Sequence, residues 1–426
     1  MVVLVSGAVS IIVINYNNMK FILFGDRHGS YEGMCNSLCE TNICYTVDKV
    51  IHEIIDNANN NGEYVDVYLE SPVIDPSYHD TSSRILLDNN ILKGPLKDTI
   101  KKYHDCLYTN KCGYNNARFH YIDIRGKLNE ASVLLPIKQI KLALENYIND
   151  DIVEKILSYD EDSIKIHITF FILEFIISFF FNSDNFIESN LWKYLMLCIE
   201  SDDFINDFNK TFEKLLIVPT ENIESTINLL SDLYYIDITD NVNIAAQNAI
   251  KYVYKWCLDS LVIKEKDGKI MHLLRSQLYG LESQGDIDRA QSIKNYFITN
   301  LSSIDISPVK IIFDNFNNGR ILYLQEYSIV PELFRIYIDN IRIILPSIEL
   351  ELVDMYTLSR MFRTYPPEFR SKYKSLEHHV QPTYIIEYAG LAHIKNISDY
   401  LVSLGGDIKI YKPEVGHRRC IVSYLL

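Results

Sequence analysis

The sequence predicts an α/β protein with a mostly parallel central sheet that is split by a large α-helical insertion. A continuous apolar run near the start of the chain is typical of a strand that is covered on both faces of a parallel sheet, and a strand-like run returns near the end. An amphipathic helix between the first run and the next predicted strand gives the spacing of a parallel β-α-β unit. Residues 131–345 are mostly helical in pattern. We therefore assign the first half of the core to residues 1–130 and the second half to residues 346–426.

The first predicted strand opens the segment KFILFGDRHGSY at residues 20–31. Four apolar residues, Phe21 to Phe24, are followed by a polar turn that contains Gly25 and His28. The uninterrupted apolar run favours a buried strand that ends at this turn.

The elements that follow complete the first half of the core. A helix is predicted at residues 46–60, because apolar residues recur there every three or four positions. A strand at residues 63–69 follows it, and a third strand is predicted at residues 118–124. Residues 72–116 are polar and irregular, so we expect a surface excursion with some helix near residues 96–108.

Helices are predicted throughout the insertion, and no fixed-period repeat is present. Their ranges are 137–148, 152–157, 164–181, 191–199, 204–216, 223–235, 242–261, 271–280 and 287–301. The second half of the core is predicted to contain a helix at 348–364, a strand at 383–389, a helix at 394–404 and closing strands at 407–411 and 419–425.

The composition disfavours several classes of protein. The 426 residues are 48% hydrophobic, which is enough for a substantial core. The formal net charge is −15, so we do not expect a nucleic acid as the partner. The chain holds 30 Tyr and is rich in Ile and Asn. We interpret this bias as the mark of an AT-rich genome, which says little about function.

Two apolar stretches do not predict a membrane span. Residues 2–14 lack a basic N-terminal region, and residues 1–18 are predicted as edge strands or as an extension of the chain. Residues 164–181 contain Lys165 and Glu174 and are predicted as a buried helix. We expect a cytoplasmic protein without a membrane-spanning segment.

The eight cysteines contain no C-x-x-C pair, so a zinc knuckle is not predicted. Reduced thiols, as in a cytoplasm, are the expectation. A disulfide between Cys106 and Cys112 is the alternative.

Four polar residues fall where predicted strands end. His28 follows the first strand, Glu70 ends the second, Arg125 follows the third, and His393 follows the late strand. Both histidines belong to a G-x-x-H motif, Gly25 to His28 and Gly390 to His393. In an open parallel sheet, ligands bind at the carboxyl ends of the strands. The sequence therefore predicts that these four side chains meet at one edge of the sheet.

This set of residues has a chemical meaning. Two histidines and a carboxylate, here His28, Glu70 and His393, are a set that holds a divalent ion and leaves a position for water. Arg125 is suited to stabilise an oxyanion. Without a metal, His28 paired with Glu70 is a candidate general base for the attack of water. A structural role is the alternative for each residue, and for each histidine taken alone it is the favoured one.

Other residues near the predicted site are weaker candidates. Asp26 and Arg27 lie in the first turn, and Glu32 lies one helical turn beyond His28. On the helix at 348–364, a buried ion pair or a solvated face is the expectation for the polar residues Asp354, Tyr356 and Arg360. The pair His378–His379 and the segment 416–419 are predicted as loops.

The order of these motifs resembles that of the TraB/TIKI-like superfamily, which includes the erythromycin esterase-like and ChaN-like families. The matching elements are Gly25 to His28, Glu70 in YLES, Arg125 in YIDIRG, and Gly390 to His393 in YAGLAHI. The resemblance covers the split α/β core and not the insertion. It implies a hydrolase site built from the four residues. It also implies a metal such as manganese or cobalt if the chain is TIKI-like, a His/Glu water-activating mechanism if it is esterase-like, and haem binding if it is ChaN-like.

The leading hypothesis is a metal-dependent hydrolase that acts on a peptide or ester bond, with Mn, Co or Zn as the divalent ion. The second is a catalytically degenerate binding or structural protein on the same fold, such as a virion component or an effector. The third is binding of haem or a small molecule without turnover.

Overall fold

The computed structural model describes the following residues: 3–28, 43–72, 94–108, 112–125, 177–183, 185–200, 265–307, 329–363, 381–412 and 420–423, with isolated residues at 138, 142 and between 206 and 255. The chain divides into two compact units. The first unit contains residues 1–126, 277–296 and 352–426, and the second contains residues 127–276 and 297–351. The candidate site lies wholly within the first unit.

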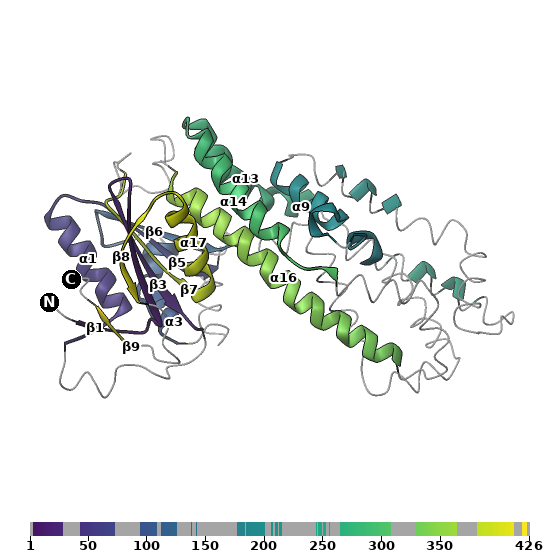
Figure 1. Ribbon diagram of the computed structural model, residues 1–426, viewed down its shortest axis with the longest axis horizontal. Helices are drawn as coiled ribbons and strands as arrows, with labels where there is room; N and C mark the ends of the chain where they lie inside the picture. The colour runs from purple at the N-terminus through teal and green to yellow at the C-terminus, as the bar shows by residue number, and fades with distance from the viewer. Residues whose placement is uncertain are drawn as a thin grey trace. The chain divides into compact units, whose positions relative to one another are not determined.

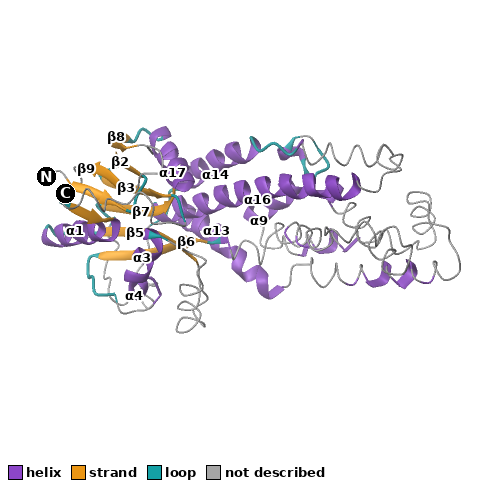
Figure 2. Cartoon of the chain, turned by 90° about the horizontal axis from the view of Figure 1, so that it is seen from below, coloured by secondary structure: helices purple, strands orange, loops and turns teal. Residues whose placement is uncertain are grey.

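The first unit is built on a six-stranded sheet (Figures 1 and 2). Its strands are β2 (Ser10–Tyr16), β3 (Met19–Asp26), β5 (Val65–Pro72), β6 (Ala117–Asp123), β7 (Tyr384–Gly390) and β8 (Asp407–Lys412), in the spatial order β6-β5-β7-β3-β2-β8. The strands β3, β7, β5 and β6 are parallel, whereas β2 runs antiparallel to β3 and β8. The predicted α/β class with a mostly parallel sheet is confirmed.

A smaller sheet lies beside the chain ends. Its strands β1 (Val3–Ser6), β4 (Cys44–Thr46) and β9 (Cys420–Ser423) have the order β4-β1-β9. The N-terminal residues thus contribute to both sheets. Strand β2 lies between β3 and β8, so the prediction that it forms an edge is wrong. Strand β2 turns tightly into β3 at Asn17 and Asn18, whose φ angles are 47° and 62°, and the later strand β8 takes the edge beyond β2.

One face of the large sheet packs on α1 (Val47–Asn60), α3 (Pro95–Lys102) and α4 (His104–Tyr108). The predicted apolar stripe of α1 is buried: it comprises Val47, Val50, Ile51, Ile54, Ile55 and Ala58. Strand residues on this face include Val67, Leu69, Ile386 and Tyr388. Because side chains alternate along a strand, Glu70 and Glu387 belong to the opposite face. That face is covered in part by α17 (Leu391–Ser403), which contacts β2, β3 and β7.

The other described helices are η2 (Phe186–Glu188), α9 (Asn190–Glu200), α13 (Glu265–Ser283), α14 (Ile287–Ser302) and α16 (Ile329–Met361). The helix predicted at 348–364 is the end of the longer α16, which contains Pro346 in its interior. A proline removes one N–H from the helix without always ending it, which is why the expected boundary at this residue is wrong.

Two boundaries also differ from the predictions. Helix α17 begins at Leu391, three residues before the predicted start, so His393 lies in its first turn. Residues 277–296 were expected in the insertion but belong to the first unit. Polar contacts with the sheet unit hold them, since Nη2 of Arg289 donates to Oη of Tyr16 at 2.6 Å. Most other predicted helices of the insertion lie outside the described residues.

The expectation of reduced cysteines is wrong for three of them. A disulfide joins Cys106 to Cys112, whose Cα atoms are 4.2 Å apart, and Cys44 is also disulfide-bonded. In the part of the chain that the structure describes, no helix has the length and apolar character needed to cross a membrane.

Candidate active site

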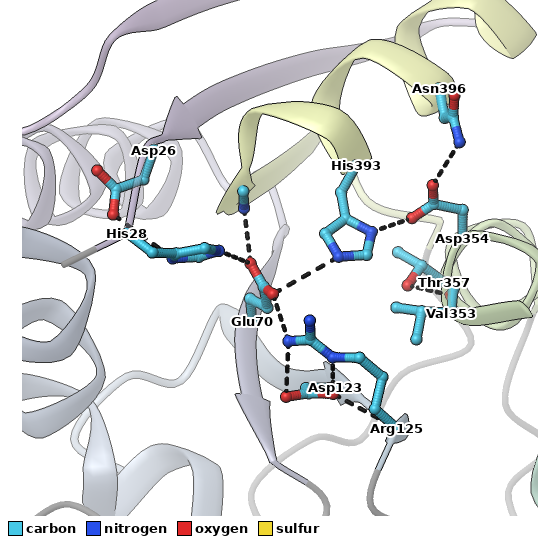
Figure 3. A network of polar contacts seen from close by, with 11 residues as sticks. Asp26, His28, Glu70, Asp123, Arg125, Val353, Asp354, Thr357, His393 and Asn396 are labelled. Carbon is cyan, nitrogen blue, oxygen red and sulfur yellow. Dashed lines mark hydrogen bonds and ion pairs between the residues drawn. The ribbon is translucent and has the colours of Figure 1, made fainter. Parts of the chain in front are cut away.

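The structure brings the four predicted residues together in one network (Figure 3). His28 follows β3, Glu70 lies near the end of β5, Arg125 follows β6, and His393 is the third residue of α17. Strand β7, which leads into α17, lies between β3 and β5. The carboxyl ends of these parallel strands therefore deliver all four side chains to the same edge.

Glu70 is the centre of the network. Its Oε2 atom accepts a hydrogen bond from the backbone N–H of Gly390 at 2.6 Å and lies 3.1 Å from Nε2 of His28. Its Oε1 atom accepts a hydrogen bond from Nη2 of Arg125 at 2.7 Å and lies 3.5 Å from Nε2 of His393. Burial by itself raises the pKa of Glu70, but the contacts with His28 and His393 outweigh burial and hold the pKa well below its usual value. Glu70 is therefore ionised at neutral pH.

His28 is the most exposed of the four predicted side chains, with 46% of its surface accessible compared with 37% for Arg125. Its Nδ1 atom lies 3.7 Å from Oδ2 of the buried Asp26. The hydrogen bond with Glu70 raises the pKa of His28; burial opposes this, and the charge of Asp26 adds to it. His28 thus presents an imidazole to solvent with a carboxylate on each side.

His393 is buried and lies between two carboxylates. Its Nδ1 atom is 2.5 Å from Oδ1 of Asp354, and its Nε2 atom faces Glu70. The second oxygen of Asp354 accepts a hydrogen bond from Nδ2 of Asn396 at 3.0 Å. Burial by itself lowers the pKa of His393, but Asp354 and Glu70 outweigh burial and raise it well above the usual value.

Arg125 is held by two carboxylates. Asp123 accepts from Nε at 2.8 Å and from Nη2 at 3.0 Å, and Glu70 accepts from Nη2 as well. A fork of this kind fixes the plane of the guanidinium, which lysine does not do. Arg125 therefore brings a positive charge to a fixed place beside Glu70.

The two G-x-x-H motifs meet because their strands are neighbours in register. Gly25 pairs with Ala389, and Asp26 pairs with Gly390. A Cβ atom on Gly390 would lie 2.7 Å from Nε2 of His28, and a Cβ atom on Gly25 would clash with Oγ of Ser10. Glycine at each motif therefore provides the space in which the two turns approach each other.

Some members of the network were considered only weakly from the sequence, or not at all. Asp354 was expected as a buried ion pair or on a solvated face, and the structure pairs it with His393. Asn396 was missed, although its spacing of three from His393 on one helix is a usable signal. Glu387 was also missed. It is fully buried on β7, and neither of its carboxylate oxygens has a hydrogen-bond partner among the described residues.

Two of the weaker candidates belong to a different cluster. Nε of Arg360 donates to Nδ1 of His120 at 3.2 Å, and Nη1 donates to Oη of Tyr356 at 2.5 Å. Arg118 forms a two-pronged contact with Asp66 in the same part of the sheet. Glu32, His378, His379 and segment 416–419 lie outside the described residues.

The charge of the network suits a cation. Its carboxylates are those of Asp26, Glu70, Asp123 and Asp354. With Arg125 as the guanidinium and both imidazoles neutral, these groups carry three negative charges in excess. Protons on the imidazoles or a divalent cation would relieve that excess. Imidazole nitrogens and a carboxylate are also ordinary ligands of zinc and related metals, so the residues fit a divalent ion in charge and donor type.

The candidate metal ligand Glu70 is already engaged in hydrogen bonds within the protein. Both oxygens of Glu70 already accept hydrogen bonds, from Gly390 and from Arg125. Within the described residues, no group of three His, Cys, Asp or Glu side chains is arranged around a common point as metal ligands are.

Comparison with known proteins gives no relative for this chain: no protein-family model, no curated protein and no solved structure matches it.

Proposed function

We propose that this protein is a hydrolase that activates water at the network around Glu70 and cleaves an ester or peptide bond. The observation that carries the proposal is that the buried, ionised Glu70 contacts Nε2 of a half-exposed histidine, His28, and the guanidinium of Arg125. A base and a fixed positive charge beside one carboxylate are the parts that acyl hydrolysis needs.

His28 is the general base in this proposal. When its Nε2–H group donates to Glu70, Nδ1 carries the lone pair that accepts a proton from water. The 3.7 Å between Nδ1 and Oδ2 of Asp26 is longer than a direct hydrogen bond, and a separation of this kind is often bridged by a water molecule. Glu70 then stabilises the imidazolium that forms when water attacks the substrate carbonyl.

Arg125 stabilises the negative charge that develops on the carbonyl oxygen of the substrate. Its guanidinium is 37% exposed, and Asp123 and Glu70 fix its orientation, so it needs little rearrangement during the reaction. His393 has a supporting role, because its side chain is buried and its Nε2 atom faces Glu70.

A metal-dependent form of the reaction is the alternative to His28 as the base, and in it His28, Glu70 and His393 would hold a divalent ion. When bound, such an ion supplies a Lewis acid and lowers the pKa of a water molecule. The resemblance to TraB/TIKI-like hydrolases in the order of the motifs supports this choice, as does the excess of negative charge in the network.

The test is a hydrolysis screen on protein purified without chelator, with metal content measured by elemental mass spectrometry. Substrates are p-nitrophenyl esters of increasing acyl length and a fluorogenic peptide library, each with and without added Mn²⁺, Co²⁺ or Zn²⁺. We expect His28→Ala to lower kcat/KM by a factor of about 10² to 10⁴, the usual range for a general base.

His52→Ala is the matched control. His52 is 43% exposed and also faces a carboxylate, that of Asp56 at 3.4 Å, but it lies on α1 and outside the network. It should keep full activity. Full activity in His28→Ala would overturn the proposal, as would the absence of turnover on every substrate with every metal.

A non-catalytic binding or structural role is the second candidate function. The hydrogen bonds at Glu70 favour this role. Both of its oxygens accept hydrogen bonds from neighbouring segments, and such a carboxylate can serve only to hold those segments together. Folded protein that takes up neither metal nor haem and turns over no substrate would favour this role. A Soret band on addition of haem would instead favour the haem-binding alternative.

A further inference from the structure

We propose that Asp354 is a positioning residue that holds the imidazole of His393, with the Nδ1–H group donating to Asp354 and Nε2 directed at Glu70. The inference rests on the proposed hydrolase function for its effect on rate, but not for its effect on the imidazole.

The first observation is the contact itself. Oδ1 of Asp354 lies 2.5 Å from Nδ1 of His393, and both side chains are buried, with exposures of 0% and 5%. Burial raises the pKa of Asp354, whereas its contacts with His393 and Asn396 oppose this; an ionised Asp354 has no proton to donate, so the proton of this contact lies on the imidazole nitrogen. In buried sites, the hydrogen bond at one ring nitrogen determines whether the other nitrogen carries a proton.

The second observation is that Asp354 is itself fixed. Its other oxygen accepts a hydrogen bond from Nδ2 of Asn396, at 3.0 Å. His393 and Asn396 are three residues apart on α17 and therefore share one face of the helix. Both oxygens of Asp354, which belongs to α16, are thus bound to the same face of α17 (Figure 3).

The third observation is the direction of the ring. With Nδ1 tied to Asp354, the opposite nitrogen points along the ring axis toward Oε1 of Glu70, at 3.5 Å. His393 therefore connects Asp354 on α16 to Glu70 on β5 through its two ring nitrogens. A residue that only tied two helices together would not require this direction.

Asp354→Asn is the decisive variant, because it keeps the shape of the side chain and reverses its hydrogen bonding. The amide N–H donates to Nδ1, which forces the proton to Nε2. In the Ser-His-Asp triad, the same replacement of Asp by Asn leaves the geometry intact and gives the histidine the wrong tautomer. We expect kcat to fall by at least about 10-fold while KM changes less than about 2-fold, as for other residues that orient a functional histidine.

A purely structural role of Asp354 would not change which ring nitrogens of His393 are protonated, so this protonation is the readout. In protein labelled with ¹⁵N-histidine, long-range ¹H–¹⁵N correlation distinguishes protonated from unprotonated ring nitrogens. The signal of His393 is assigned by its loss in His393→Gln. We expect a protonated Nδ1 in the unsubstituted protein and an unprotonated Nδ1 in Asp354→Asn.

The controls separate this inference from general damage. Asp66→Asn alters another buried aspartate that faces a histidine, His120 at 3.7 Å, and should leave the ¹⁵N signal of His393 and the kcat of folded protein unchanged. If Asp354→Asn does not fold, Asp354→Ser removes the charge without added volume and should give His393 a mixture of ring states.

The outcomes are distinct for the two proposals. If Nδ1 of His393 stays fully protonated in Asp354→Asn, or in Asp354→Ser where that variant is needed, the positioning role is wrong, whatever the enzyme does. Unchanged kcat in a variant whose Nδ1 has lost its proton also overturns the role. If the unsubstituted protein hydrolyses nothing, the proposed function fails, and the ring state still decides whether Asp354 fixes His393.

Discussion

Nε2 of His28 occupies the space in which a side chain on Gly390 would begin. A Cβ atom built on Gly390 would lie 2.7 Å from this nitrogen and 3.3 Å from Oε2 of Glu70. The backbone of Gly390, with φ −56° and ψ 146°, is one that any residue adopts, so glycine is needed here for space and not for conformation. The backbone N–H of the same residue donates to Glu70. Gly390 thus admits one member of the network and binds another.

Gly390→Ala should therefore impair the site more than the fold. The added methyl group must push the half-exposed imidazole of His28 away from Glu70, which has a low cost in stability because the ring can move into solvent. We expect hydrolysis to fall by at least about 10-fold and the free energy of unfolding to change by less than about 1 kcal/mol. Steady-state kinetics and urea unfolding followed by circular dichroism measure the two effects.

Gly113→Ala is the control for this substitution, since nothing lies within 4 Å of a Cβ atom at Gly113. It should change neither quantity. Full activity in Gly390→Ala would mean that the position of His28 beside Glu70 is not needed for the reaction.

The sequence predicted the part of this architecture that depends on local pattern. An uninterrupted apolar run identified β3, a mostly apolar run identified β7, and the 3.6-residue period identified the buried face of α1. The two G-x-x-H motifs then placed His28 and His393 at neighbouring strand ends, because parallel strands end at the same edge. These predictions succeeded where one residue's environment follows from its near neighbours in the chain.

The rest depends on packing between distant segments. Asp354 lies 39 residues before His393 in the chain, and only the packing of α16 against α17 brings their side chains together. Glu387 carried a signal that sequence reasoning overlooked, because it is the one charged residue in the apolar run YIIEYAG. A charge inside a strand that is buried on both faces needs either a partner or a proton.

A second buried cluster predicts how stability depends on pH. Burial lowers the pKa of His120 to about 4; Asp66 opposes this and Arg360 adds to it. His120 is stacked on Tyr68, with ring centroids 4.4 Å apart, so the folded state keeps it neutral. A group whose pKa is lowered by folding stabilises the fold above its unfolded pKa, and this contribution is lost as the pH falls toward its folded pKa. The window for His120 is thus from about 6.5 down to about 4.

We expect protonation of His120 alone to lower the free energy of unfolding by on the order of 3 kcal/mol between pH 6.5 and pH 4, since each tenfold change in proton affinity corresponds to about 1.4 kcal/mol. His28 and His393 have raised pKa values, so their contributions are already complete below pH 6.5 and do not change across this window. Urea unfolding at several pH values measures the slope. His120→Gln, which cannot titrate, should flatten it, whereas the half-exposed His52→Gln should not.

The disulfide between Cys106 and Cys112 connects the redox state of the protein to the neighbourhood of Glu70. Cys106 lies on α4, whose last residue, Tyr108, forms a hydroxyl–hydroxyl hydrogen bond with Ser71. We expect the double substitution Cys106→Ser and Cys112→Ser to lower the free energy of unfolding by about 2 kcal/mol, because the unfolded chain loses a cross-link. Hydrolysis should fall a few-fold as α4 loosens.

Dithiothreitol provides the control for this bond. It should reproduce the loss in the unsubstituted protein, and any effect that remains in the double variant comes from another disulfide, such as that of Cys44. If the double variant matches the unsubstituted protein in both stability and rate, the bond has no part in holding α4.

Glu387 and Glu70 lie on the same face of neighbouring strands, yet replacing them should have opposite effects on stability. Both oxygens of Glu70 accept hydrogen bonds, whereas those of Glu387 have no hydrogen-bond partner among the described residues. Burial raises the pKa of Glu387 well above its usual value, and the charge of Asp354 adds to this. Glu387→Leu should therefore stabilise the protein by about 1 to 3 kcal/mol, the cost of an unsatisfied buried polar group. Glu70→Gln should destabilise it, because Arg125 loses a charged partner.

The pH dependence separates this effect from simple repacking. A raised folded pKa means that Glu387 contributes most favourably below about 4.5, its unfolded value, and that this contribution is lost as the pH rises. The gain in Glu387→Leu should consequently be small near pH 4 and grow toward pH 8, as measured by urea unfolding at each pH. A gain that is the same at all pH values would come from packing alone. A loss of stability at pH 7 would mean that Glu387 is ionised in the fold and bound to a partner.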